Sequence, residues 1–263
     1  DSFPLNVGMV GAYCKQFYPD LNMKLFKYPE KLISKINQNM PDLLGLSNYP
    51  WNHNLNISIA KHVKSINKNV VIVFGGPYIS YDNNQQELFM TRYEGLVDFY
   101  CMFEGETSFK SLLDNAHQAS FDISQMKKAP LEGCLFLSED GSLAPFTPIT
   151  RSRSVDDYPS PYTAGLFDEF FDGKLSPMLE THRGCPYACT FCHEGHSLIT
   201  KVHYYSLFLE FFPAETLIAK ALQKILNLSH KKNFQIRFLL KYSQPQTEWI
   251  LYFRRSETEL SGL

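Results

Sequence analysis

Several features that would assign a protein class directly are scarce or missing in this sequence of 263 residues. The formal net charge is only −2 and no basic cluster occurs, so nucleic acid is not an expected partner. No apolar run approaches the roughly 20 residues that a membrane helix needs. The first residues do not form a signal-peptide pattern. These absences predict a cytoplasmic location and no membrane partner.

A disulfide framework is missing as well. Cys14, Cys101 and Cys134 are scattered, without a spacing that suggests pairing, which favours a reducing compartment. We interpret these three cysteines as small buried apolar side chains. The chain begins at Asp1 directly before a predicted helix and ends soon after a second group of cysteines. We therefore expect a fragment of a longer protein, inactive alone.

The first 117 residues or so alternate between strand-like and helix-like segments. The run Val70–Phe74 is continuously apolar and mostly β-branched, which is typical of a strand buried on both faces. Alternation of this kind predicts an α/β fold with a doubly wound parallel sheet. The predicted helices cover 8–17, 29–38, 54–66 and 107–116, and the predicted strands cover 23–27, 42–47, 70–74 and 96–103.

Small and polar residues follow three of these predicted strands. Ligands of doubly wound sheets bind at the carboxyl ends of the strands, and glycine there lets the backbone approach a ligand closely. We therefore predict a binding cleft, although tight turns alone would also explain such residues. The candidates are Ser47, Asn48, Gly75, Gly76, Glu104 and Gly105.

Residues 130–146 are predicted to form a β-hairpin around Asp140-Gly141, a strong hairpin-turn sequence. Residues 147–175 are rich in Pro, Ser and Asp and are predicted to be a linker with a short helix over 163–171. A strand over 176–181 would then begin a second domain. Later in the chain, a helix is predicted over 213–228 and a strand over 234–240.

Cys185, Cys189 and Cys192 follow that strand at the spacing C-x-x-x-C-x-x-C. Clustered thiolates select zinc, copper(I) or an iron–sulfur cluster. Three cysteines would leave one iron of a cubane cluster without a protein ligand. Two alternatives stay open: a structural zinc site with His193 or His196 as the fourth ligand, and a loop of free cysteines.

The stretch from Arg183 to Cys192 resembles the signature of the radical S-adenosylmethionine (radical SAM) superfamily. This resemblance implies a 4Fe-4S cluster on the three cysteines, with S-adenosylmethionine chelated to the free iron and Phe191 near its adenine. It also implies reductive cleavage to a 5′-deoxyadenosyl radical, supplied with electrons by a reductant such as flavodoxin or ferredoxin. The cofactors would carry the chemistry, and no residue of the chain is assigned a catalytic role.

The first half is similar to the cobalamin (vitamin B12)-binding Rossmann-like domain that precedes many radical SAM enzymes. The similar stretches are Leu46–Tyr49, Val70–Pro77 and Phe103–Phe109. The resemblance implies that the six residues after the strands contact cobalamin. The D-x-H-x-x-G motif, which supplies a cobalt ligand in many such domains, does not occur in the sequence. His53 and His62 do not lie in such a motif and are interpreted as surface histidines.

Together these expectations divide the chain into a cobalamin-binding-like Rossmann domain with hairpin (1–146), a linker (147–175) and the start of a truncated radical SAM partial (β/α) barrel (176–263). The expected reaction is methyl transfer or rearrangement on a substrate that is a small molecule or of unknown class. One alternative is a zinc-stabilised binding or structural module. Another is a methylthiotransferase with a second cluster on Cys14, Cys101 and Cys134, which are not expected to converge.

Overall fold

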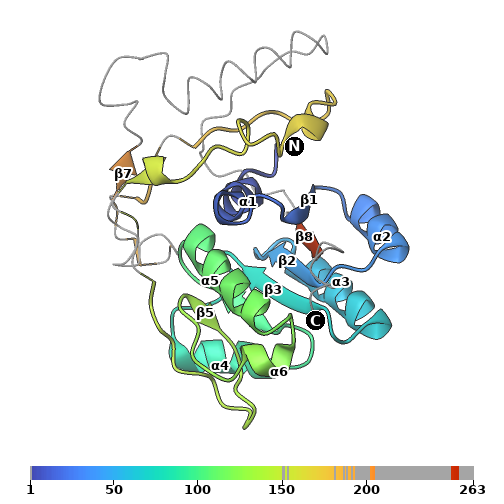
Figure 1. Cartoon of the computed structure of the whole chain (residues 1–263). Helices are drawn as coiled ribbons and strands as arrows, with labels where there is room; N and C mark the ends of the chain where they lie inside the picture. Colours follow the sequence, from blue (N-terminus) through green and yellow to red (C-terminus); the bar gives the residue numbers. More distant parts are fainter. Residues whose placement is uncertain are drawn as a thin grey trace. The chain divides into compact units, whose positions relative to one another are not determined.

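The computed structural model describes residues 2–149, 152, 154–180, 182–185, 187, 189–190, 192, 202–204 and 250–254. The chain forms two compact units, and each is described by itself (Figure 1). One unit holds residues 1–12 and 150–246, and the other holds residues 13–149 and 247–263. The sequence-based boundaries, by contrast, place residues 250–254 in the predicted barrel segment 176–263.

The second of these units is an α/β layer structure. Its strands are β1 (Asn22–Phe26), β2 (Leu43–Ser47), β3 (Val71–Gly75), β4 (Phe99–Cys101), β5 (Cys134–Leu135) and β8 (Ile250–Arg254). Its helices are the end of α1 (Leu5–Phe17), then α2 (Pro29–Gln38), α3 (His53–Ile66), α4 (Asn83–Arg92), α5 (Gly105–Gln118) and α6 (Ile123–Met126). No described helix is both long and apolar enough to cross a bilayer.

The sheet order is β1-β8-β2-β3-β4-β5. Strands β2, β3 and β4 are parallel neighbours, and β1 runs in their direction because β8 is antiparallel to both β1 and β2. The predicted parallel α/β sheet is thus confirmed for β1 to β4. Two antiparallel strands modify it: β5 at one end, and β8, which was not predicted and lies between β1 and β2 (Figure 1).

The core explains the apolar runs of the strands. Alternate residues such as Leu44, Ile72 and Tyr100 belong to a core cluster that includes residues of α2, α3 and α4. The intervening residues, such as Val71 and Phe99, are equally buried on the other face, where Figure 1 shows α5 opposite α3. Because side chains of a strand alternate between faces, both faces must be apolar when helices cover both.

Strand β4 is shorter than the predicted 96–103. The backbone N–H of Val97 still bonds to the turn at Tyr93, and Phe103 has φ +58, which ends extended pairing. Helix α4 was not predicted, because its sequence has little apolar periodicity and buries only Gln86 and Met90. The hairpin over 130–146 is confirmed by the bridge Leu137↔Leu143 and by a turn in which Gly141 has φ +81.

The other unit contains a cluster of aromatic rings around Phe3. The helix predicted over 163–171 is wrong: turns and the 3-10 helix Asp168–Phe170 occur instead, because Gly165 has φ +76. The strand predicted over 176–181 is also wrong for its described residues. Ser176 makes only an isolated bridge with Ser2, and the Tyr162 hydroxyl bonds to both backbone groups of Met178.

A small two-stranded sheet follows, in which β6 (His182–Arg183) pairs with β7 (His203–Tyr204). A second 3-10 helix covers Val155–Asp157. The helix predicted over 213–228 and the strand predicted over 234–240 lie outside the described residues. The start of a barrel therefore stays a prediction.

Candidate cofactor-binding site

The loops after β2 and β3 meet at the carboxyl edge of the sheet. The backbone N–H of Asn48 donates to the carbonyl of Gly75 at 2.5 Å. The hydroxyl of Tyr100 donates to the carbonyl of Gly76 at 2.8 Å. Gly76 has φ +110, and a Cβ added there would lie 2.9 Å from the carbonyl oxygen of Asn48. Only glycine allows this close approach. Ser47 is paired with Gly75 in the register of β2 and β3, so four of the predicted residues are brought together.

An amide network holds the loop after β2. The Asn52 side chain accepts a hydrogen bond from the Tyr49 N–H at 2.7 Å and donates to the Ser47 carbonyl at 2.9 Å. Asn56 donates to the same carbonyl at 2.9 Å. Asn52 and Asn56 are almost fully buried. The sequence analysis missed both, although an asparagine at the start of a helix is a common capping signal.

His53 is not a surface histidine, and that interpretation is wrong. It is 4% exposed and stacks on Tyr78 with ring centroids 4.0 Å apart. Its Nδ1 lies 3.2 Å from Oδ1 of Asn48 and its Nε2 lies 2.8 Å from the Tyr93 hydroxyl. Burial and the charge of Arg92 lower the pKa of His53. A neutral imidazole therefore links the loop after β2 to α4.

The same edge carries exposed aromatic rings and orphaned polar atoms. Tyr49 and Trp51 stack at 4.7 Å, and Trp51 is 47% exposed. Tyr78 is 37% exposed. Two buried atoms, Oγ of Ser47 and Nδ2 of Asn48, make no hydrogen bond in the structure. Because buried polar groups are normally hydrogen-bonded, these two atoms indicate that a bound molecule supplies their hydrogen-bond partners at this edge.

The loop after β4 is strained. Phe103 has φ +58, an unusual conformation for a bulky residue. Its ring stacks on Tyr81 at 5.3 Å. Glu104 is the N-cap of α5, and its carbonyl accepts from the Ser108 N–H and hydroxyl. Gly105 is the first residue of α5. Strained backbone of this kind concentrates at functional sites, which agrees with the predicted role of this loop.

The cysteine loop lies in the other unit. Cys189 and Cys192 are exposed and Cys185 is half-buried. The Cys192 N–H donates to the Cys189 carbonyl at 3.1 Å, so the last two cysteines share a turn. Among the described residues, no three His, Cys, Asp or Glu side chains are grouped closely enough to hold a metal ion. Phe191, His193 and His196 lie outside the described residues.

The three remaining cysteines are buried, which confirms their interpretation as core residues. Two of them form a close pair that their spacing in the sequence did not suggest, because the sulfurs of Cys101 and Cys134 are 3.7 Å apart. Cys14, Cys101 and Cys134 together do not form a three-ligand metal group among the described residues. A shallow groove of about 390 Å³ also exists, lined by Tyr13, Phe17, Thr107, Lys110, Ser111, Asp114, Glu132 and Ile149, and it contains none of the predicted residues.

The part of the chain that contains the sheet edge matches a known protein family. Residues 1–113 match the family model of the B12 binding domain. The mainly parallel sheet and its carboxyl-edge loops are the structure expected of such a domain.

Curated relatives extend the similarity. The cobalamin-dependent radical SAM methyltransferase TokK of Streptomyces tokunonensis is 28% identical over 204 residues, which is 73% of this chain and 28% of TokK. The 2-(S-pantetheinyl)-carbapenam-3-carboxylate methyltransferase of Streptantibioticus cattleyicolor gives 28% identity over 203 residues, with 73% and 28% covered. An uncharacterised methyltransferase of Pyrococcus horikoshii is 32% identical over 166 residues, with 62% and 33% covered. The chain thus spans about a third or less of the length of these relatives.

The residues at this edge of the matched region fit cobalamin. A corrin ring is flat, large and fringed with amide groups, so it needs hydrogen-bonding partners along its rim and apolar surface against its faces. The carboxyl edge offers the orphaned polar atoms of Ser47 and Asn48, together with the exposed rings of Trp51 and Tyr78. Positions 75 and 76 are glycines, so no side chain of these two residues would prevent a flat ligand from approaching the backbone there. The donor chemistry and the shape therefore agree with the family match.

Proposed function

We propose that the chain is the cofactor-binding part of a cobalamin-dependent radical SAM methyltransferase, with cobalamin held at the carboxyl edge of β2, β3 and β4. The observation that carries this proposal is the match of residues 1–113 to the B12 binding domain. Ser47, Asn48, Gly75, Gly76, Glu104 and Gly105, all at or directly beside the strand ends of that edge, would contact the cofactor.

We further propose that Cys185, Cys189 and Cys192 hold a 4Fe-4S cluster, with S-adenosylmethionine beside it and Phe191 against the adenine. A single matched segment covering 73% of the chain necessarily includes its central part, from about residue 73 to about residue 190, which supports an extension of the similarity into the cysteine loop. Cluster and cobalamin would supply radical chemistry and a transferable methyl group. The chain's own task is to bind and orient them.

The relatives favour methyl transfer over rearrangement, since all three carry the word methyltransferase in their names. A methylthiotransferase would use a second cluster on Cys14, Cys101 and Cys134, and these do not form a three-ligand metal group among the described residues. The zinc-stabilised module is tested directly by the metal content of the cysteine loop.

Cobalamin binding is tested with Trp51 as the reporter. The chain has two tryptophans, Trp51 and Trp249, so a Trp249→Phe variant leaves only the one at the proposed site. Titration with hydroxocobalamin should quench its fluorescence with a saturable curve, because corrinoids absorb where tryptophan emits. Substitution of Asn48 by Leu in the same background should weaken binding at least several-fold. A linear, non-saturating response would refute the proposed site.

The cluster is tested by anaerobic reconstitution with iron and sulfide. Four irons per chain and an EPR signal after reduction are expected, and Cys189→Ala should lose most of the iron. Cys14→Ala is the matched control, because Cys14 is a buried cysteine of the other unit, and it should keep the full iron content. A single zinc per chain that persists in air, without iron, would support the structural module instead.

A further inference from the structure

Cys101 and Cys134 face each other across two antiparallel strands. Strands β4 and β5 place them in direct register. The Met102 N–H donates to the Gly133 carbonyl at 2.8 Å, which makes Cys101 and Cys134 a non-hydrogen-bonded pair. In such pairs the Cα atoms approach to about 4.5 Å, which is inside the roughly 4.4–6.8 Å range that a disulfide spans.

The sulfur atoms already point toward each other, at 3.7 Å. Two of their neighbours are a glycine and a backbone carbonyl. On the parallel neighbour β3, Gly75 has no side chain, and a Cβ there would lie 3.6 Å from the Cβ of Cys101. The Cys134 sulfur also lies 3.7 Å from the Ser108 carbonyl. Rotation about the two Cα–Cβ bonds is therefore the main change that bond formation requires.

The pair lies where the sheet can open. Strand β5 has two residues and is the last strand of the sheet, paired only with β4. Short terminal strands with few hydrogen bonds open more readily than central strands. Although Cys101 is 6% exposed and Cys134 is 2% exposed, a brief opening of β5 would uncover both thiols at once.

We propose that Cys101 and Cys134 are a reversible redox site that closes as a disulfide between β4 and β5. The oxidant is a small disulfide such as oxidised glutathione. One thiolate attacks the glutathione disulfide and releases one glutathione thiol. The second cysteine then loses its proton, attacks the mixed disulfide and releases the other. Two protons and two electrons thus leave the protein, and one protein S–S bond forms.

The bond would fasten the hairpin to β4 directly before the strained loop Met102–Gly105. Nothing in this step depends on cobalamin or on a cluster, so it stands apart from the proposed function. Oxidation should therefore raise the denaturation midpoint of the unit that holds the sheet, because a cross-link restricts the unfolded chain.

Peptide mapping tests the proposal on the full chain. The reduced protein is incubated anaerobically with excess oxidised glutathione, alkylated, and digested with trypsin without reduction. Cleavage after Lys and Arg puts Cys101 in peptide 93–110, Cys134 in 129–151, Cys14 in 1–15 and the cysteine loop in 184–201. The expected product is 93–110 linked to 129–151, lighter than the two free peptides by two hydrogens and separated again by dithiothreitol.

Two variants and one measurement keep the test decisive. Cys14→Ala should leave the linked peptide unchanged, whereas Cys134→Ser should abolish both the link and the rise in the denaturation midpoint on oxidation. If that variant does not fold, Cys101→Ala serves in its place. Recovery of Cys101 and Cys134 as separately alkylated peptides, after the loop peptide 184–201 has been oxidised, would overturn the proposal. A link from Cys101 to Cys14 would overturn it as well.

Discussion

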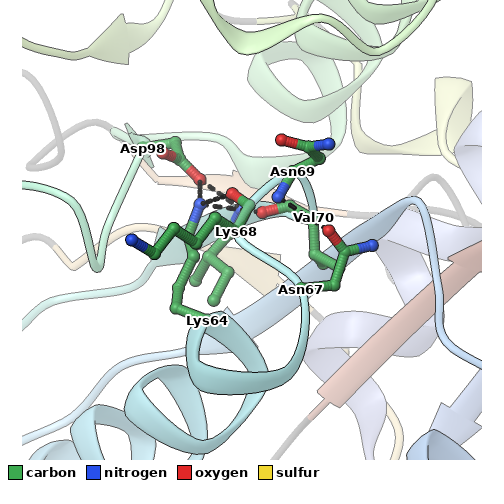
Figure 2. Close-up of polar contacts among 7 residues, drawn as sticks. Lys64, Asn67, Lys68, Asn69, Val70 and Asp98 are labelled. Atoms are coloured by element: carbon green, nitrogen blue, oxygen red, sulfur yellow. Dashed lines mark hydrogen bonds and ion pairs between the residues drawn. The ribbon is translucent and has the colours of Figure 1, made fainter.

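Replacement of Asp98 by Asn should destabilise the sheet without disturbing the cofactor site. Figure 2 shows the contacts of Asp98 and Lys64. The Lys64 Nζ lies 2.7 Å from Oδ2 of Asp98 and also donates to the carbonyls of Lys68 and Val70, at 3.1 and 2.9 Å. The same Asp98 oxygen accepts from the Ile72 N–H at 2.7 Å. The pair therefore joins the end of α3 to the amino ends of β3 and β4.

The size of the effect follows from burial. The side chains of Lys64 and Asp98 are 8% and 5% exposed, so removal of one charge leaves the other without its partner in the interior. Such a change costs about 3–5 kcal/mol, whereas replacement of both members by apolar residues is often nearly neutral. For Asp98→Asn we expect a loss of about 3 kcal/mol in the free energy of unfolding. The double variant Lys64→Met/Asp98→Leu should lose much less than the sum of the single changes.

Urea denaturation followed by far-ultraviolet circular dichroism measures these losses. The pH dependence of these losses provides a second test, because the pKa of Asp98 determines the direction in which they change. Burial raises the pKa of Asp98 even with Lys64 beside it, and a carboxyl with a raised folded pKa contributes stability at low pH that is lost as pH rises through that pKa. Lys64→Met removes a charge that lowers the pKa, so its destabilisation should be larger near neutral pH than below about pH 4. A loss under about 1 kcal/mol for Asp98→Asn, or additive single changes, would refute this reasoning.

Two further predictions concern the loops. Gly76→Ala should lower both stability and cobalamin affinity, because its Cβ would meet the Asn48 carbonyl oxygen at 2.9 Å. Gly95 is the control, since it also has positive φ but a Cβ there would meet nothing within 4 Å, so Gly95→Ala should show only the conformational cost of about 1–2 kcal/mol. Equal losses of stability in urea denaturation would contradict the proposed contact at Gly76. Burial lowers the pKa of His53, so its stabilising contribution should disappear as pH falls through that lowered pKa. His53→Gln should flatten the pH dependence of amide exchange in residues 47–53, and an unchanged profile would argue against the neutral imidazole.

Local patterns explain how much of the fold the sequence predicts. The apolar run at Val70–Phe74 and the helix periodicity at 54–66 agree with β3 and α3 to within a residue, because both are determined by burial of neighbouring residues. Strand β8 was missed because its place between β1 and β2 depends on pairing with residues more than two hundred positions away. A hydrophobic pattern carries no information about such a partner.

The candidate site shows the same limit. Glycines at 75 and 76 could be predicted, because a turn after a parallel strand requires particular backbone angles and small residues. His53 could not be placed, since its burial comes from Tyr78 and Tyr93 on other segments. The contact between Cys101 and Cys134 likewise depends on the register of β4 and β5, which the spacing of cysteines along the chain does not contain.

Hydrogen–deuterium exchange with and without hydroxocobalamin tests the central claim most directly, because it reports where the cofactor binds. The account predicts that cobalamin slows amide exchange in residues 47–53, 75–78 and 102–106, the three loops at the carboxyl edge of the sheet. Protection confined to the groove lined by Lys110 and Asp114, or no protection at saturating cobalamin, would contradict it.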